Sequence, residues 1–211
     1  MTLILFRRRF IVPSLIVLAV LIVAFALIAP ADKVLGYRVK MVYVHGGIIR
    51  VVLVTFMLAA LLSLAYLIFN RAALLDWARA LTQASLILWA AYFVISLITT
   101  IQTWGGIAWF EPRWIFTLQI SAIAPIAYAI GVVMKNARVS AALNIAVAGL
   151  ILWLEARAQL VLHPRDPIGT SGDAAIQFAY TSMLILWALI GLQLVRELRA
   201  RAATRTAPSD S

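Results

Sequence analysis

The residues from Phe10 to Ala29 read FIVPSLIVLAVLIVAFALIA and include no charged side chain. A helix of about 20 residues is long enough to cross the hydrocarbon core of a bilayer, which is about 30 Å thick. A helix at the surface of a soluble protein would carry polar residues on one face. The stretch therefore predicts a transmembrane helix.

Five more apolar runs follow along the chain. They cover residues 41–69, 81–103, 114–134, 139–162 and 174–195. Charged residues make up only 12% of the sequence, against about 25% in soluble domains. We therefore predict an all-α, polytopic membrane protein with six transmembrane helices in a single domain of residues 1–199. This composition excludes a soluble enzyme with a detachable anchor and a single-span receptor.

The two ends of the chain carry further expectations. Arg7, Arg8 and Arg9 before the first apolar run resemble the start of a secretory signal. The run is longer than the 7–15 apolar residues of a typical signal peptide, so we expect an uncleaved span. Residues 200–211 are rich in Ala, Thr, Ser and Arg, and we expect them to form a disordered tail.

The basic residues indicate how the chain sits in the membrane. The net charge is +10, but Lys and Arg lie mainly in the short segments beside the apolar runs, so we expect no nucleic-acid binding. One side would hold Arg7, Arg8, Arg9, Arg71, Arg79, Lys135, Arg138, Arg196, Arg199, Arg201 and Arg205. The other would hold Lys33, Arg38, Lys40, Arg113 and Arg165. Because cytoplasmic loops carry the excess of Lys and Arg, we predict cytoplasmic termini in a multi-pass protein of the cell (inner or plasma) membrane.

The chain has only two histidines, and this topology places both at the extracytoplasmic boundary. His45 lies at the outer end of the second predicted span and His163 at that of the fifth. The loop between the third and fourth spans, WGGIAWFEPRW over 104–114, faces the same side and holds three of the seven tryptophans. An ordinary interfacial histidine and an aromatic belt would explain each feature alone. Their coincidence on one face indicates a ligand site.

Haem suits these residue types. Two neutral imidazoles on separate helices can ligate one iron from opposite faces. An aromatic loop offers flat apolar surface to a porphyrin, and Arg113 or Arg38 could pair with the propionates. The chain has no cysteine, which excludes thiolate metal sites and covalent haem attachment through a CxxCH motif.

At these positions the chain resembles the tryptophan-rich (WWD-domain) haem-handling proteins of cytochrome c biogenesis, especially the six-helix CcmC type. The family's loop is similar to W-G-x-x-W-x-W-D-x-R. Trp104, Gly105 and Arg113 match it, Phe110 stands for a tryptophan and Glu111 for the aspartate, while Ile107 or Ala108 replaces the central tryptophan. Val42 to His45 resembles the family's first histidine motif, although Gly46 and Gly47 follow where the family has Val-Pro. Trp153 to His163 resembles the second histidine motif.

The resemblance implies a protein that presents haem at the outer membrane surface for cytochrome c maturation. The axial ligands of a transient, non-covalent haem b would be His45 and His163. The haem platform would be Trp104, Gly105, Trp109, Phe110, Glu111 and Arg113. The implied partners are a haem chaperone or cytochrome c assembly proteins, with a possible ABC-type complex. Because haem delivery breaks no covalent bond, we expect no enzyme activity.

Three ionisable residues fall inside the predicted spans, where each charge is costly. They are Arg50, Glu155 and Arg157. A buried Arg50–Glu155 ion pair would fix the second span against the fifth, and a proton or substrate path is the alternative. Glu155, Gln159 and His163 follow at i, i+4 and i+8, so they would share one helical stripe on which Gln159 could hold the His163 tautomer.

Other functions remain open. The chain could be a diverged accessory or structural subunit of a larger membrane complex, which the altered loop favours. A small transporter is disfavoured because no pair of broken helices is evident. A zinc or copper site would need more ligands than two histidines and Glu111 supply. No phosphate-binding glycine loop indicates direct use of ATP.

Overall fold

The computed structural model describes residues 10–158, 168 and 171–206. These residues form the helices α1 (Ile11–Ile28), α2 (Val39–Phe69), α3 (Ala72–Trp104), α4 (Pro112–Val133), α5 (Ala137–Arg157) and α6 (Ala174–Thr206). All six are long and apolar enough to cross a membrane. No strand forms within the described ranges. The predicted all-α fold with six membrane-spanning helices is confirmed.

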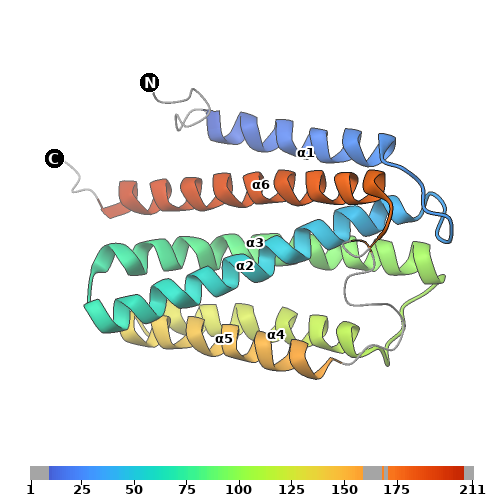
Figure 1. The fold of residues 1–211 in the computed structure, drawn as a ribbon. Helices are drawn as coiled ribbons and strands as arrows, with labels where there is room; N and C mark the ends of the chain where they lie inside the picture. The colour runs from blue at the N-terminus through green and yellow to red at the C-terminus, as the bar shows by residue number, and fades with distance from the viewer. Residues whose placement is uncertain (1–9, 159–167, 169–170, 207–211) are drawn as a thin grey trace.

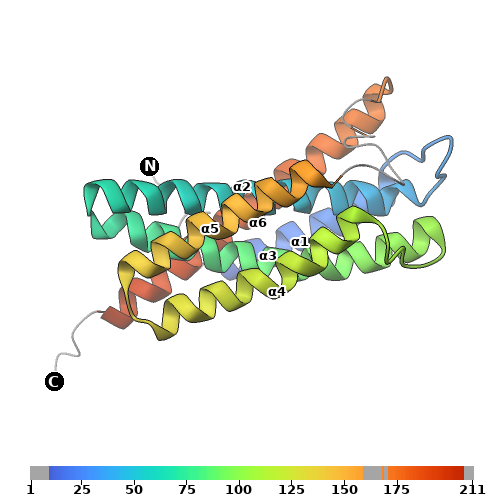
Figure 2. The same ribbon diagram turned by 90° about the horizontal axis from the view of Figure 1, so that it is seen from below.

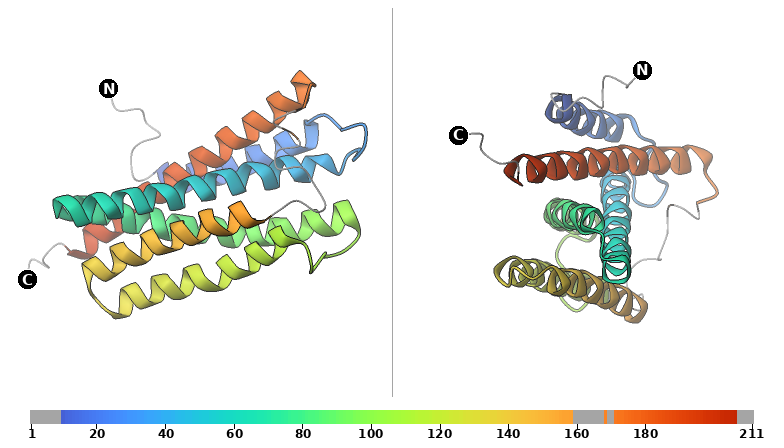
Figure 3. Two further views of the ribbon diagram at one scale, coloured as in Figure 1. Left: turned by 60° about the horizontal axis from the view of Figure 1, so that its bottom comes forward. Right: turned by 90° about the vertical axis from the view of Figure 1, so that its left-hand side faces the viewer.

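The helices stack in layers around α2. Seen end-on, α1 lies outermost on one side, followed by α6, then α2 with α3, then α4 with α5 (Figure 3). Within this stack α2 contacts α1, α3, α5 and α6, whereas α1 packs mainly on α6. The inner faces of these helices meet around Tyr43, Ile48, Val52 and Met183, which are all fully buried. The second helix is therefore the central element of the fold.

Successive helices run in opposite directions. At one end α1 begins, α6 ends, and short turns join α2 to α3 and α4 to α5 (Figure 1). The loops 29–38 and 105–111 both lie at the other end, as Figure 2 also shows. The arrangement brings His45 and the aromatic loop to the same end of the bundle. Which end faces the cytoplasm stays a prediction.

Several helix ends differ from the apolar runs. The helix α3 begins at Ala72, inside the predicted connection, and α6 continues to Thr206 through the predicted tail. These extensions pack on each other, because the Arg199 guanidinium lies over the Trp77 ring at 4.0 Å. This cation–π contact joins the parts of α3 and α6 that lie beyond the apolar runs. Conversely, α5 ends at Arg157 rather than at residue 162, since the backbone leaves the helical region at Ala158.

Polar side chains join the helices within the bundle. The Asn144 amide of α5 donates to Ser63 of α2 at 2.9 Å and accepts from Thr82 of α3 at 3.0 Å. The Ser85 hydroxyl of α3 lies 2.9 Å from that of Thr55 on α2. Asn144 and Ser85 therefore make hydrogen bonds between helices. Such bonds satisfy polar groups that lipid cannot solvate.

Gly46 and Gly47 allow α6 to approach the middle of the bundle closely. A Cβ added at Gly47 would lie 3.0 Å from Cδ1 of Trp187 and 3.3 Å from the backbone carbon of Met183. One added at Gly46 would lie 3.0 Å from the Tyr180 ring. The glycine pair, which departs from the resembled family's motif, therefore has a packing role in this chain.

Replacing Gly47 by Val should force α2 and α6 apart and lower the free energy of unfolding by about 1–3 kcal/mol, the usual cost of overpacking. Thermal unfolding in detergent measures the loss. Gly149→Ala on α5 is the matched control, because nothing lies within 4 Å of its added Cβ. Equal stability of the two variants would contradict the close α2–α6 contact.

Candidate ligand-binding cavity

A cavity of about 450 Å³ opens at the end of the bundle that holds the aromatic loop. This volume lies within the range of about 300–1,000 Å³ that ligand pockets occupy. Its walls come from α2, α3, α4, the end of α5 and the start of α6, with the 29–38 loop beside them. The polar and ionisable residues that line it include His45, Arg50, Ser96, Thr99, Thr100, Thr103, Glu111, Arg113, Thr117, Glu155 and Tyr180.

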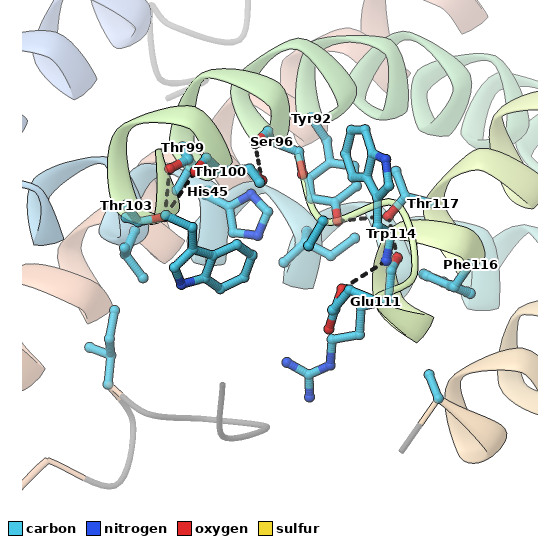
Figure 4. A pocket seen from close by; sticks show the side chains of 18 of the residues that line it. His45, Tyr92, Ser96, Thr99, Thr100, Thr103, Glu111, Trp114, Phe116 and Thr117 are labelled. Carbon is cyan, nitrogen blue, oxygen red and sulfur yellow. Dashed lines mark hydrogen bonds between the residues drawn. The ribbon is translucent and has the colours of Figure 1, made fainter. Parts of the chain in front are cut away.

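The imidazole of His45 is half-buried in the α2 wall and lies against an aromatic ring of α3 (Figure 4). The Tyr92 ring centre is 5.1 Å from that of His45, with 33° between the planes. The Tyr92 hydroxyl is 3.3 Å from that of Thr117 on α4, and the Tyr92 ring centre is also 5.1 Å from that of Trp89. Tyr92 therefore links His45 to the first turns of α4.

A stripe of hydroxyl side chains forms the α3 wall. Ser96, Thr99, Thr100 and Thr103 follow at i, i+3, i+4 and i+7, which places them on one helical face. The three threonine hydroxyls each donate to a carbonyl four residues earlier, at 2.7–2.8 Å. These hydrogen bonds lie within α3. Their protons point to the backbone, so their oxygens are left as acceptors.

Glu111 closes the loop side of the cavity. It is the N-cap of α4, and its Oε2 accepts a hydrogen bond from the Trp114 backbone N–H at 2.9 Å. Pro112 follows at the first helical position, where the missing N–H costs nothing. The Glu111 side chain is only 3% exposed. The N-cap hydrogen bond therefore holds the carboxylate in the cavity wall.

The aromatic loop divides into residues that face the cavity and residues that do not. Trp104, at the end of α3, lines it together with Trp114 and Arg113. Trp109 and Phe110 are 62% and 72% exposed and are not part of the lining. Gly105 ends α3 with a left-handed backbone (φ 77°), which turns the chain into the loop. The predicted platform thus contributes Trp104, Glu111 and Arg113 to the cavity, but not Gly105, Trp109 or Phe110.

Two of the three ionisable residues in the predicted spans line the cavity, and the third does not. Arg50 and Glu155 line the same cavity, as their predicted pairing requires. All three residues are exposed, so the burial predicted for the Arg50–Glu155 pair is wrong. Arg157 lies outside the cavity lining, with its guanidinium 4.9 Å from the centre of the Trp153 ring. A polar cavity lowers the cost of placing charge within a span. The Arg50–Glu155 ion pair itself stays a prediction.

Three of the predicted positions lie outside the described residues: Gln159, His163 and Arg165. The second axial ligand and the Gln159 stripe therefore stay predictions. Arg38 immediately precedes α2 and is not among the residues that line the cavity. Of the two histidines, the structure places His45 on the cavity wall.

The 29–38 loop is held beside the cavity by Asp32. Its Oδ1 accepts from the backbone N–H groups of Val34 and Leu35, both at 2.8 Å, and these two residues line the cavity. The same hydrogen bonds lower the pKa of Asp32 below its usual value, because they stabilise the charged carboxylate. The apolar rim of the cavity thus depends on a turn that a single carboxylate organises.

Sequence reasoning missed Tyr92, Thr117 and Tyr180 as cavity residues. The hydroxyl stripe on α3 carried a signal in its spacing, but Tyr92 and Thr117 are single polar residues in apolar runs. Within the described part of the chain, no three His, Cys, Asp or Glu side chains gather to hold a metal ion. No family model, curated protein or solved structure matches the chain.

Removing the Tyr92 ring should shift the ring-proton resonances of His45, because the aromatic ring lies 5.1 Å away. We expect Tyr92→Leu to move these signals and Tyr92→Phe to leave them nearly in place. Histidine-labelled protein in detergent gives a simple NMR spectrum, since the chain has only two histidines. Tyr66→Leu, on the distant part of α2, serves as the control. Unchanged His45 signals in Tyr92→Leu would contradict the contact.

If Arg50 and Glu155 form the predicted pair, their effects on stability will not add. We expect the double alanine variant to lose less free energy of unfolding than the two single variants together, by about 0.5–3 kcal/mol. Arg157→Ala combined with Glu155→Ala is the control pair, because Arg157 packs on Trp153. Additive losses for Arg50 and Glu155 would exclude the pairing.

Proposed function

We propose that this chain is a haem-binding membrane protein that presents haem at the extracytoplasmic face for cytochrome c maturation. One observation carries the proposal. His45 and the loop residues Trp104, Glu111 and Arg113 are more than 50 residues apart in sequence, yet they line one cavity. These residues carry the resemblance to the tryptophan-rich haem-handling proteins. Their meeting in one cavity is what that resemblance requires.

The residues of the cavity fit the chemistry of haem. An imidazole is a common axial ligand of haem iron, and His45 presents one on the α2 wall. Trp104, Trp114 and Phe116 supply aromatic surface around the same space. Guanidinium groups pair well with carboxylates, so Arg50 and Arg113 are suited to the propionates. His163 is the expected second ligand.

Non-covalent binding suits delivery rather than permanent storage. The chain has no cysteine to form a thioether bond, so a haem held here could be released intact. Trp109 and Phe110 are exposed beside the cavity. We assign these two residues to contact with the haem-receiving partner, because large exposed aromatic side chains are typical of interaction surfaces.

The test is the ultraviolet–visible spectrum of the protein purified from haem-replete cells, oxidised and then reduced with dithionite. We expect a Soret band with low-spin features that weakens or shifts in both His45→Ala and His163→Ala. Trp104→Leu should lower the haem content, whereas Trp77→Leu, at the opposite end of the bundle, should leave it unchanged. A wild-type protein that carries no haem, and takes up none when haem is added, would refute the proposal.

A further inference from the structure

Glu111 carries a buried acceptor that the described residues do not use. Its side chain is 3% exposed, it lines the cavity, and its Oε1 receives no hydrogen bond from any residue that the structure describes. A buried carboxylate oxygen without a donor is strongly unfavourable. A group inside the cavity would remove this cost by donating a hydrogen bond.

Helix capping alone does not explain the residue. One oxygen, Oε2, already caps α4 through the Trp114 N–H. Asp, Asn, Ser and Thr are the usual N-cap residues, and each would fill that role with a shorter side chain. Figure 4 shows the Glu111 carboxylate at the cavity, with the dashed bond to the backbone of Trp114. The cap uses only Oε2, so the second carboxylate oxygen, Oε1, is available to a ligand.

The neighbouring threonine hydroxyls are acceptors too. The hydroxyl protons of Thr99, Thr100 and Thr103 go to carbonyls of α3, and the Thr117 proton goes to the Arg113 carbonyl at 2.9 Å. These hydroxyls therefore present oxygen lone pairs to the cavity, beside the donor N–H of the Trp114 indole. A ligand group that meets them has to be a donor, and a primary ammonium with three N–H bonds satisfies several acceptors at once.

The same cavity also suits an anionic group and a hydrocarbon. Arg50 and Arg113 line it and can hold a phosphate. Ile49, Leu53 and Phe116 add apolar surface. The α2 part of the lining runs from Val42 to Leu53, a rise of about 16 Å at 1.5 Å per residue. The cavity thus extends from the end of the bundle along several turns of α2, one of the helices apolar enough to cross a membrane.

We propose that the cavity binds a zwitterion that joins a primary ammonium to a phosphate, and that the bilayer supplies it as phosphatidylethanolamine. The ammonium donates to Glu111 Oε1, the phosphate pairs with the arginines, and the acyl chain follows the apolar wall. This inference goes beyond the proposed function and does not depend on it. It concerns the occupant of the cavity in the haem-free protein.

The experiment reconstitutes the full chain in nanodiscs of phosphatidylethanolamine and phosphatidylcholine in equal parts, followed by native mass spectrometry of the released protein. Phosphatidylcholine is the matched lipid, because its quaternary ammonium has no N–H to donate. We expect the wild type to retain phosphatidylethanolamine about tenfold over phosphatidylcholine, the ratio that one charge-assisted hydrogen bond supplies. Glu111→Gln and Glu111→Asp should both lose this preference.

Glu197→Gln, at the opposite end of the bundle, is the control and should retain it. Glu111→Asp keeps a good N-cap for α4, so it guards against a variant that fails to fold. Equal retention of the two lipids by the wild type, or an unchanged preference in both Glu111 variants, would overturn the proposal. Competition by an equal concentration of glycerophosphoethanolamine would overturn the lipid as the source and assign the soluble zwitterion instead. Haem content decides none of these outcomes.

Discussion

The close contact of α2 with α6 is the interaction on which the rest of the structure depends. Gly46 and Gly47 present no side chain, so Tyr180 and Trp187 of α6 lie directly against the α2 backbone. This contact lets one helix touch four others and become the centre of the bundle. Helices gain little hydrophobic stabilisation from association within lipid, so small residues and dispersion contacts have to hold them together. His45, next to the glycine pair, is thereby fixed at the cavity wall.

Polar chemistry is distributed unequally along the bundle. Toward one end, Asn144, Ser63 and Thr82 satisfy one another and leave a tightly packed interior. Toward the other, His45, Arg50 and Glu111 line a cavity large enough for a ligand. The first group stabilises the fold, because polar atoms in lipid require partners. The second lines a cavity with a few polar groups among apolar ones, which is typical of a binding site.

The cavity is also mechanically connected to the aromatic loop. The loop ends at Glu111, which starts α4, and Thr117 of α4 contacts the Tyr92 hydroxyl. Tyr92 in turn lies against His45. Two contacts thus lie between α4, which the loop leads into, and the imidazole of the proposed haem ligand.

Some features followed from the sequence because they depend on neighbouring residues alone. Long apolar runs with few charges predicted the six spanning helices. The helix ends were predicted less well, since α3 and α6 extend through charged residues that pack on each other. A hydropathy pattern carries no information about such a contact.

Which side chains meet depends on the tertiary structure. The sequence placed His45 and the 104–114 loop on one side of a membrane, but it gave Trp109 and Phe110 the same role as Trp104. The fold turns Trp104 toward the cavity and the other two outward. It also adds Tyr92, which no local pattern distinguished. The length of an apolar run can be read directly from the sequence. The direction in which a side chain points depends on how helices that are distant in sequence pack together.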